Sequence, residues 1–256
     1  MCTLLIGLQT DPRWPLVIAA NRDEFLKRPA TPPMRLSEAP RVVGGRDLVA
    51  GGTWMGVTPG GFFAGVTNQA RAPGPPAPQS RGSAVLHVLT LGEVEAAAQW
   101  LRGLVASDYH PFNLLFGTAE DLRVAYARPG EPVEVAAVAP GFHVLPNDIL
   151  NSPRFPKVER ARALTDGTWE SMEAALRDTQ TPAILPERPV HMPPDVYAAV
   201  HRLLVRTPVY GTVSATSVAL APGRVGHYRY AAGGPDLSPF TDFTDQVYDT
   251  PGPTGE

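Results

Sequence analysis

Short blocks of apolar residues separated by turn residues predict strands near the start of the chain. The runs 2–8 and 15–20 flank an Asp-Pro turn, which predicts an N-terminal hairpin. The stretch 26–50 contains four prolines and predicts a loop. The runs 52–57 and 62–67, joined by a Pro-Gly-Gly turn, predict a second hairpin.

The rest of the chain alternates between helical and strand-like groups. Leucine, valine and alanine recur at helical spacing over 82–106, which predicts one or two helices after a proline-rich surface loop. Further strands are predicted at 112–116, 122–127, 133–138, 142–145, 209–220 and 224–230, and further helices at 156–164, 169–176 and 194–205.

The order of these elements predicts the fold class. Groups of strands and groups of helices follow one another without the regular β and α alternation of a parallel doubly wound sheet. We therefore expect an α+β fold, a four-layer α/β/β/α sandwich of two antiparallel sheets. A single domain is expected over 1–230. Residues 231–256 contain five acidic residues and no lysine or arginine, which predicts an acidic, loosely ordered C-terminal extension.

Charge and hydropathy exclude several classes of partner. The net charge is −3 and the 22 basic residues are dispersed, so no footprint for nucleic acid is visible. No apolar run reaches the roughly 20 residues of a membrane span, and the first 20 residues lack the pattern of a secretory signal. We expect a cytoplasmic protein with a small-molecule substrate or ligand; its oligomeric state stays open.

The cysteine count narrows the chemistry further. One cysteine excludes a disulfide within the chain, and the six histidines show no metal-ligand spacing, so neither a metal nor a cofactor is expected. The cysteine is Cys2, which becomes N-terminal if Met1 is removed. Its α-amine, with a pKa of roughly 7.7–8, can then take the proton of its own thiol. The alternative is a small apolar side chain packed in a strand.

Polar residues follow the second apolar run directly. In Asn21-Arg22-Asp23-Glu24, strand alternation places Asn21 and Asp23 on one face and Arg22 and Glu24 on the other. Asn21 and Asp23 are candidate catalytic residues beside Cys2, and Arg22 is a candidate orienting group. An ordinary polar strand end with an Arg–Asp surface pair, worth about 0–1 kcal/mol, is the alternative.

Two further positions are candidates. Trp54 lies among glycines, which suits either a pocket wall or a packed hairpin. Asn68 ends its strand and is a candidate amide donor to an oxyanion.

Nine short motifs occur in order between residue 1 and about residue 220: Met1-Cys2, Asn21-Arg22-Asp23-Glu24, Gly45-Arg46-Asp47, Gly51-Gly52-Thr53-Trp54-Met55-Gly56-Val57, Thr67-Asn68, Ser80-Arg81-Gly82, Asn113-Leu114-Leu115-Phe116-Gly117, Pro156-Lys157-Val158 and Tyr210-Gly211-Thr212. Together they resemble the NRDE family, which includes the eukaryotic transport and Golgi organisation 2 proteins. The resemblance implies a fold like that of N-terminal nucleophile hydrolases, with Cys2 in the position of the nucleophile of choloylglycine hydrolase and penicillin V acylase. Those enzymes cleave linear amide bonds of small acylated substrates.

The resemblance also implies roles for individual residues. Asn68 matches the Thr-Asn step, and Asn147 matches a Leu-Ser-Asn step for which Asn151 competes. Trp54 and Arg46 are candidate substrate-binding residues. The function implied is a cysteine amidohydrolase acting on a small acyl-amide.

Two departures from the family pattern favour a rival function. Ala20 stands where an Arg-x-x-Asp element has arginine, and Val213 where Tyr-Gly-Thr-Arg-Ser has arginine. The rival is a non-catalytic protein of the same fold that binds or traffics haem or a lipid-related small molecule.

Overall fold

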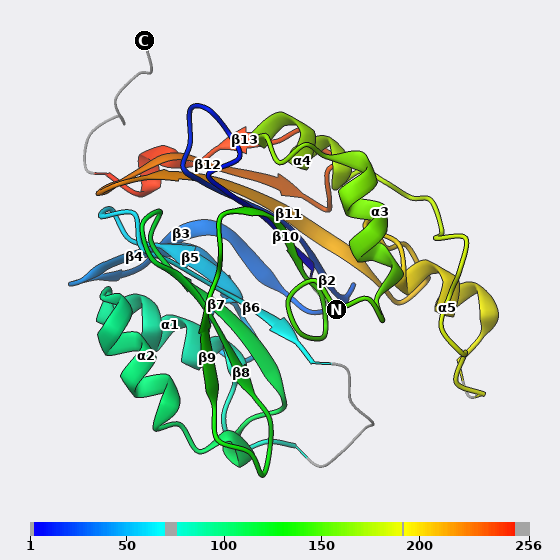
Figure 1. Cartoon of the computed structure of the whole chain (residues 1–256), viewed down its shortest axis with the longest axis horizontal. Helices are drawn as coiled ribbons and strands as arrows, with labels where there is room; N and C mark the ends of the chain where they lie inside the picture. Colours follow the sequence, from blue (N-terminus) through cyan, green and yellow to red (C-terminus); the bar gives the residue numbers. More distant parts are fainter. Residues whose placement is uncertain (1–2, 70–75, 191, 249–256) are drawn as a thin grey trace.

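Two antiparallel sheets lie face to face in this computed structural model, which describes residues 3–69, 76–190 and 192–248 (Figure 1). Sheet A contains, in spatial order, β10 (Gly141–Leu145), β1 (Thr3–Leu8), β2 (Leu16–Phe25), β11 (Tyr210–Ala221), β12 (Arg224–Ala232) and β13 (Thr241–Asp242). Sheet B contains β3 (Ala30–Glu38), β4 (Arg41–Asp47), β5 (Met55–Val57), β6 (Phe63–Asn68), β7 (Phe112–Gly117), β8 (Leu122–Ala127) and β9 (Glu134–Ala137).

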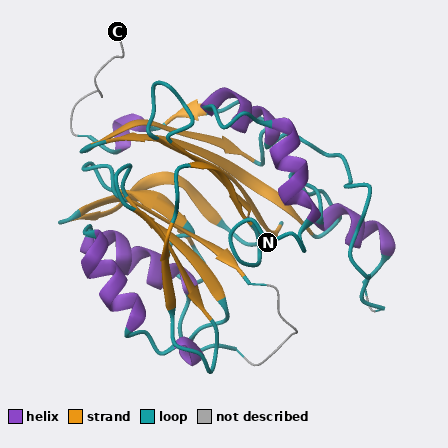
Figure 2. Cartoon of the chain, in the orientation of Figure 1, coloured by secondary structure: helices purple, strands orange, loops and turns teal. Residues whose placement is uncertain are grey.

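Helices cover the outer faces of both sheets (Figure 2). On sheet B lie α1 (Arg81–Leu91) and α2 (Val94–Arg102), and on sheet A lie α3 (Pro156–Leu164) and α4 (Trp169–Ala175). A further helix, α5 (Pro194–Val200), and two 3₁₀ turns, Ala106–Asp108 and Thr244–Gln246, complete the elements. The expected four-layer α/β/β/α architecture of two antiparallel sheets is confirmed.

Strand alternation explains why β2 lies between two apolar layers. Leu16, Ile18 and Ala20 belong to the apolar cluster between the two sheets. Val17 and Ala19 belong to the cluster under α3 and α4. Both faces of the strand are therefore covered, which is why its sequence is continuously apolar before Asn21.

The predicted loop over 26–50 is wrong, because this stretch contains β3 and β4. β3 is the edge strand of sheet B, where prolines are tolerated since one side of the strand forms no ladder hydrogen bonds. Its pairing with β4 shifts register between Ala30 and Pro33 and again between Arg35 and Ser37. Proline content alone therefore misled the prediction at an edge strand.

The part of the C-terminal extension that the structure describes packs on sheet A, contrary to the loose order expected from residue 231. β12 continues to Ala232, and β13 pairs with it. Phe240 and Val247 of this segment are buried in two of the apolar clusters of the fold, and their burial anchors the segment. Residues 249–256 lie outside the described ranges.

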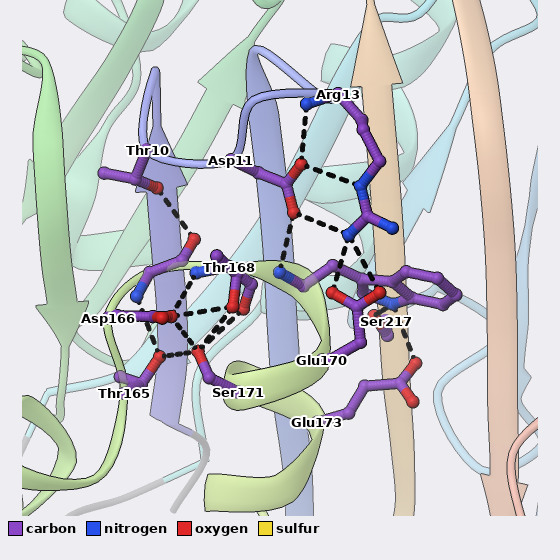
Figure 3. Close-up of polar contacts among 12 residues, drawn as sticks. Thr10, Asp11, Arg13, Thr165, Asp166, Thr168, Glu170, Ser171, Glu173 and Ser217 are labelled. Carbon is purple, nitrogen blue, oxygen red and sulfur yellow. Dashed lines mark hydrogen bonds and ion pairs between the residues drawn. The ribbon is translucent and has the colours of Figure 1, made fainter.

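Helix α4 is fixed to sheet A by polar contacts at its first turn (Figure 3). The Asp11 carboxylate, in the turn between β1 and β2, accepts hydrogen bonds from the Trp169 N–H at 3.0 Å and the Arg13 N–H at 2.8 Å. Arg13 also forms an ion pair of 2.6 Å with Glu170. Although burial opposes ionisation, these contacts hold the pKa of Asp11 below its ordinary value.

Candidate functional site

A cavity of about 700 Å³ lies where the end of β2 meets the end of β6 and the start of α1. This volume falls within the range of small-molecule sites. β2 contributes Arg22, Asp23 and Glu24, β6 contributes Asn68, and Trp54 comes from the segment before β5. Residues of both sheets therefore line the cavity, and several of them are candidates from the sequence.

Arg22 points between the sheets, on the same face of β2 as Ala20. Its side chain is 7% exposed, and its guanidinium lies 4.3 Å from the centre of the Trp54 ring. Gly45 makes room for that ring, since a Cβ at this position would come within 2.1 Å of it. Gly45 therefore serves the packing of the indole that supports Arg22, whereas a Cβ at Gly52 would meet the backbone of Gly82 instead.

Asp23 points to the opposite face of β2 and is 3% exposed. The Thr212 hydroxyl donates a hydrogen bond of 2.7 Å to its Oδ1, and the Tyr210 hydroxyl donates one of 2.8 Å to its backbone carbonyl. Burial raises the pKa of the Asp23 carboxyl, whereas the charges of Lys157 and Arg206 and the bond from Thr212 oppose that rise.

Asn21 shares this face with Asp23, as strand alternation predicts. Its Nδ2 donates hydrogen bonds of 2.9 Å to the carbonyls of Leu176 and Leu203. Its Oδ1 is buried and has no hydrogen-bond partner among the described residues. Asn21 thus ties β2 to the helical layer and leaves one acceptor for a further donor.

Asn68, the last residue of β6, is contacted by Asn147, which lies just after β10 of the other sheet. The Asn147 Nδ2 donates a hydrogen bond of 2.7 Å to the Asn68 carbonyl. The Asn68 side chain lines the cavity, and within the described ranges it makes no hydrogen bond to another residue. The amide of Asn68 is therefore available to a ligand in the cavity, while Asn147 fixes the backbone of Asn68 through its carbonyl.

Asn113 fixes the chain segment that carries Asn147. Its Nδ2 donates to the Thr67 hydroxyl at 2.9 Å, to the Pro146 carbonyl at 3.2 Å and to the Asp148 carbonyl at 2.8 Å. The segment 146–148 is thereby joined to β6 and β7. This gives the Asn113-Leu114-Leu115-Phe116-Gly117 motif a structural role.

Asn151, the other asparagine considered for this role, does not contact Asn68. It adopts a positive φ of 59°. Its Oδ1 accepts from the Val144 N–H at 2.9 Å, and its Nδ2 contacts the His143 ring at 2.8 Å. Of the two asparagines, the structure brings Asn147 to Asn68.

Two other positions singled out from the sequence, Arg46 and Val213, do not line the cavity. The guanidinium of Arg46 instead donates to the carbonyls of Gly51 and Leu36 at 3.3 Å each. Val213 is an extra residue in a β-bulge of β11, between Thr212, which pairs with Asp23, and Ser214, which pairs with Arg22. Cys2 lies outside the described residues.

Sequence reasoning did not assign roles to three residues that act on Asp23. Lys157 is 1% exposed at the start of α3, and Arg206 binds Asp236 and the carbonyls of Thr212 and Gly233. The third is Thr212. Lys157 carried a usable signal, since it is one of only two lysines in the chain and lies within a family motif.

Among the described residues, no group of three or more His, Cys, Asp and Glu side chains is arranged to hold a metal ion. No helix in the described ranges has the length and apolar character needed to cross a bilayer.

Solved structures with a similar fold include one named as an amidase and one named as a bile acid hydrolase. The Caenorhabditis elegans N-acylethanolamine-hydrolyzing acid amidase ortholog matches with a TM-score of 0.54 and 12% identity, over 85% of this chain and 92% of that one. The C2A mutant of conjugated bile acid hydrolase from Clostridium perfringens matches with a TM-score of 0.53 and 11% identity, over 97% and 94%. The expected likeness to the N-terminal nucleophile hydrolase fold is confirmed.

Sequence comparison identifies nearer relatives. The Transport and Golgi organization protein 2 homolog of Homo sapiens is 30% identical over 93% of this chain and 95% of its own length. The homolog of Bos taurus is 32% identical over 88% and 91%. The family model described as Transport and Golgi organisation 2 matches residues 1–228, and the chain therefore belongs to that family.

Proposed function

We propose that the chain is a cysteine amidohydrolase that cleaves a small acyl-amide, with Cys2 as the nucleophile after removal of Met1. The observation that carries the proposal is the meeting of Asp23, Asn68 and a cavity of about 700 Å³ beside the start of β1. Thr3 pairs with Asn21. Cys2 is one peptide unit before Thr3, a Cα separation of about 3.8 Å.

The proposed reaction needs no cofactor. The Cys2 sulfur bonds to the amide carbonyl carbon while the thiol proton passes to the α-amine, which gives a tetrahedral oxyanion. The carbon–nitrogen bond then breaks, and the leaving amine takes that proton. Water adds to the thioester carbon, the carbon–sulfur bond breaks, and a proton returns to sulfur as the acid leaves.

Each polar residue of the site has a role in this proposal. The Asn68 side chain donates to the oxyanion, a kind of contact whose loss costs about 10²–10³-fold in kcat. Asp23 and the free Oδ1 of Asn21 accept hydrogen bonds from the α-amine and orient it. Asn147 is a positioning residue that acts through Asn68.

Mass spectrometry and a substrate panel test the proposal. The intact mass is expected to lack Met1, because a retained Met1 leaves the nitrogen of Cys2 in a peptide bond and unable to act as a base. On a panel of N-acyl amides, Cys2→Ala is expected to abolish turnover. Retention of Met1, or equal turnover by wild type and Cys2→Ala, would refute the proposed mechanism.

A second candidate, non-catalytic binding of haem or a lipid-related molecule, is favoured by one observation. His110 lines the cavity and offers an imidazole as an axial ligand. Haem titration tests it: a Soret shift abolished by His110→Ala supports haem binding, and an unchanged spectrum speaks against it.

A further inference from the structure

We propose that Arg22 recognises a carboxylate on the ligand of this cavity, so that the ligand is an acidic acyl-amide. The inference rests on the proposed function for the amide, but the carboxylate site itself requires only that the cavity binds a ligand. It specifies a class of ligand that neither the fold nor the family determines.

The positive charge of Arg22 is buried without an anionic partner among the described residues. Arg22 is 7% exposed, and no carboxylate within the described ranges lies within 4.0 Å of its guanidinium. Burying a charge without a partner is costly, and buried charges in proteins are normally paired. A partner supplied by the ligand removes that cost when it binds.

The neighbouring carboxylates on the cavity wall are already engaged by other groups. Arg28 forms an ion pair of 2.7 Å with Asp47 and lies 3.7 Å from Glu24. Glu24 also accepts a hydrogen bond of 2.8 Å from the Phe25 N–H. Asp23 points to the other face of β2, where Thr212 binds it. None of these three carboxylates is placed to neutralise Arg22.

An aromatic ring supports the guanidinium of Arg22. Trp54 lies 4.3 Å from it and supports it by a cation–π contact. Arginine N–H groups point outward in the guanidinium plane, where they match the two oxygens of a carboxylate. A side chain that is buried, supported by an aromatic ring and exposed to a cavity has the features of a preorganised anion site.

Apolar residues form a smaller part of the mostly polar cavity wall. The cavity wall includes Val66, Ala50 and the segment 76–78, which reads Pro-Ala-Pro. A ligand with an acyl chain and one carboxylate can therefore satisfy the apolar wall and Arg22 together.

Binding measurements on the Cys2→Ala protein test the proposal without turnover. The probes are N-octanoyl derivatives of glycine, β-alanine and 4-aminobutyrate, each compared by calorimetry with its primary amide. Three spacer lengths are used because the carboxylate must reach Arg22. We expect at least one acid to bind about tenfold or more tightly than its amide, and we expect Arg22→Met to abolish that preference.

Two variants sharpen the result. Arg22→Lys keeps the charge without the planar fork, so a reduced but measurable preference for the acid is expected. Arg128→Met is the matched control, because Arg128 stacks on Tyr126 at 5.4 Å outside the cavity. It is expected to leave the preference unchanged. Circular dichroism checks that each variant is folded.

The outcomes separate this inference from the proposed function. If no acid is preferred by the parent protein, or if the preference survives in folded Arg22→Met, the carboxylate site is refuted. If the preference is present but the wild type releases no amine, the carboxylate site stands and hydrolysis fails. If hydrolysis occurs equally for acids and amides, hydrolysis stands and the carboxylate site is refuted.

Discussion

Asn147, which follows the last residue of β10 by two positions, donates a hydrogen bond of 2.7 Å to the carbonyl of Asn68 at the end of β6. This bond joins the segment that follows β10 of sheet A to the end of β6 of sheet B, beside the cavity-lining residue Asn68. Because Asn147 is 2% exposed, water cannot readily replace it when the side chain is removed.

Asn147→Ala is therefore expected to lower kcat on an amide substrate by about tenfold, since Asn68 loses its support, while Asn68→Ala costs about 10²–10³-fold. Both are measured by steady-state kinetics. Asn151→Ala is the control, because Asn151 binds Val144 and His143 instead. Equal kcat in Asn147→Ala and wild type would contradict the positioning role.

Thr212→Val removes the hydroxyl that donates to Asp23 and accepts from the Val205 N–H at 3.0 Å. Two buried groups lose a partner, so we expect a loss of about 1–3 kcal/mol in the free energy of unfolding, measured in urea. In the wild type, the hydrogen bond from Thr212 lowers the pKa of Asp23. The variant lacks this bond, so the pKa of Asp23 rises and the acidic limb of kcat/KM moves to higher pH. Thr216→Val, which changes a buried threonine of the same strand, should leave that limb in place.

Lys157→Met is also expected to move the acidic limb of kcat/KM to higher pH. Burial raises the pKa of Asp23 and the Lys157 charge lowers it, so removing the charge raises the pKa further. Asp23 is then protonated over a wider acidic range, and activity in that range falls. Lys27→Met is a matched control because Lys27 is exposed and is the other lysine of the chain. A pH profile identical to that of wild type would show that Lys157 does not act on Asp23.

Asp166 is expected to titrate at unusually low pH. Hydrogen bonds from Ser171 and from Thr168 lower its pKa to about 2. A depressed pKa in the folded state adds stability above the unfolded value of about 3.9, and that contribution is lost as pH falls toward 2. Carboxyl NMR measures the titration directly; a midpoint near 4 would contradict the hydrogen bonding drawn in Figure 3.

The layers of the fold were predictable because most strands and helices carry their own local pattern. β2 shows this best, since its alternation also placed Asn21 and Asp23 on one face. β3 was missed because Pro32 and Pro33 are tolerated only at the edge of a sheet, and a strand's position in the sheet is not a local property.

The site was predictable only where its residues lie in motifs on adjacent strands. Arg206 and Thr212 reach Asp23 from more than 180 positions away in the sequence, through the pairing of β2 with β11. Contacts between residues this far apart in the sequence cannot be predicted from the spacing of residues within a motif. Arg46 was placed in the substrate site by its motif, but its guanidinium satisfies backbone carbonyls instead.

The bulge at Val213 has a consequence for variation at this position. Because the extra residue lies outside the pairing of β11 with β2, Thr212 pairs with Asp23 and Ser214 pairs with Arg22 on either side of it. Exchange of arginine for valine here can therefore alter the electrostatic field at the site without disturbing strand registry.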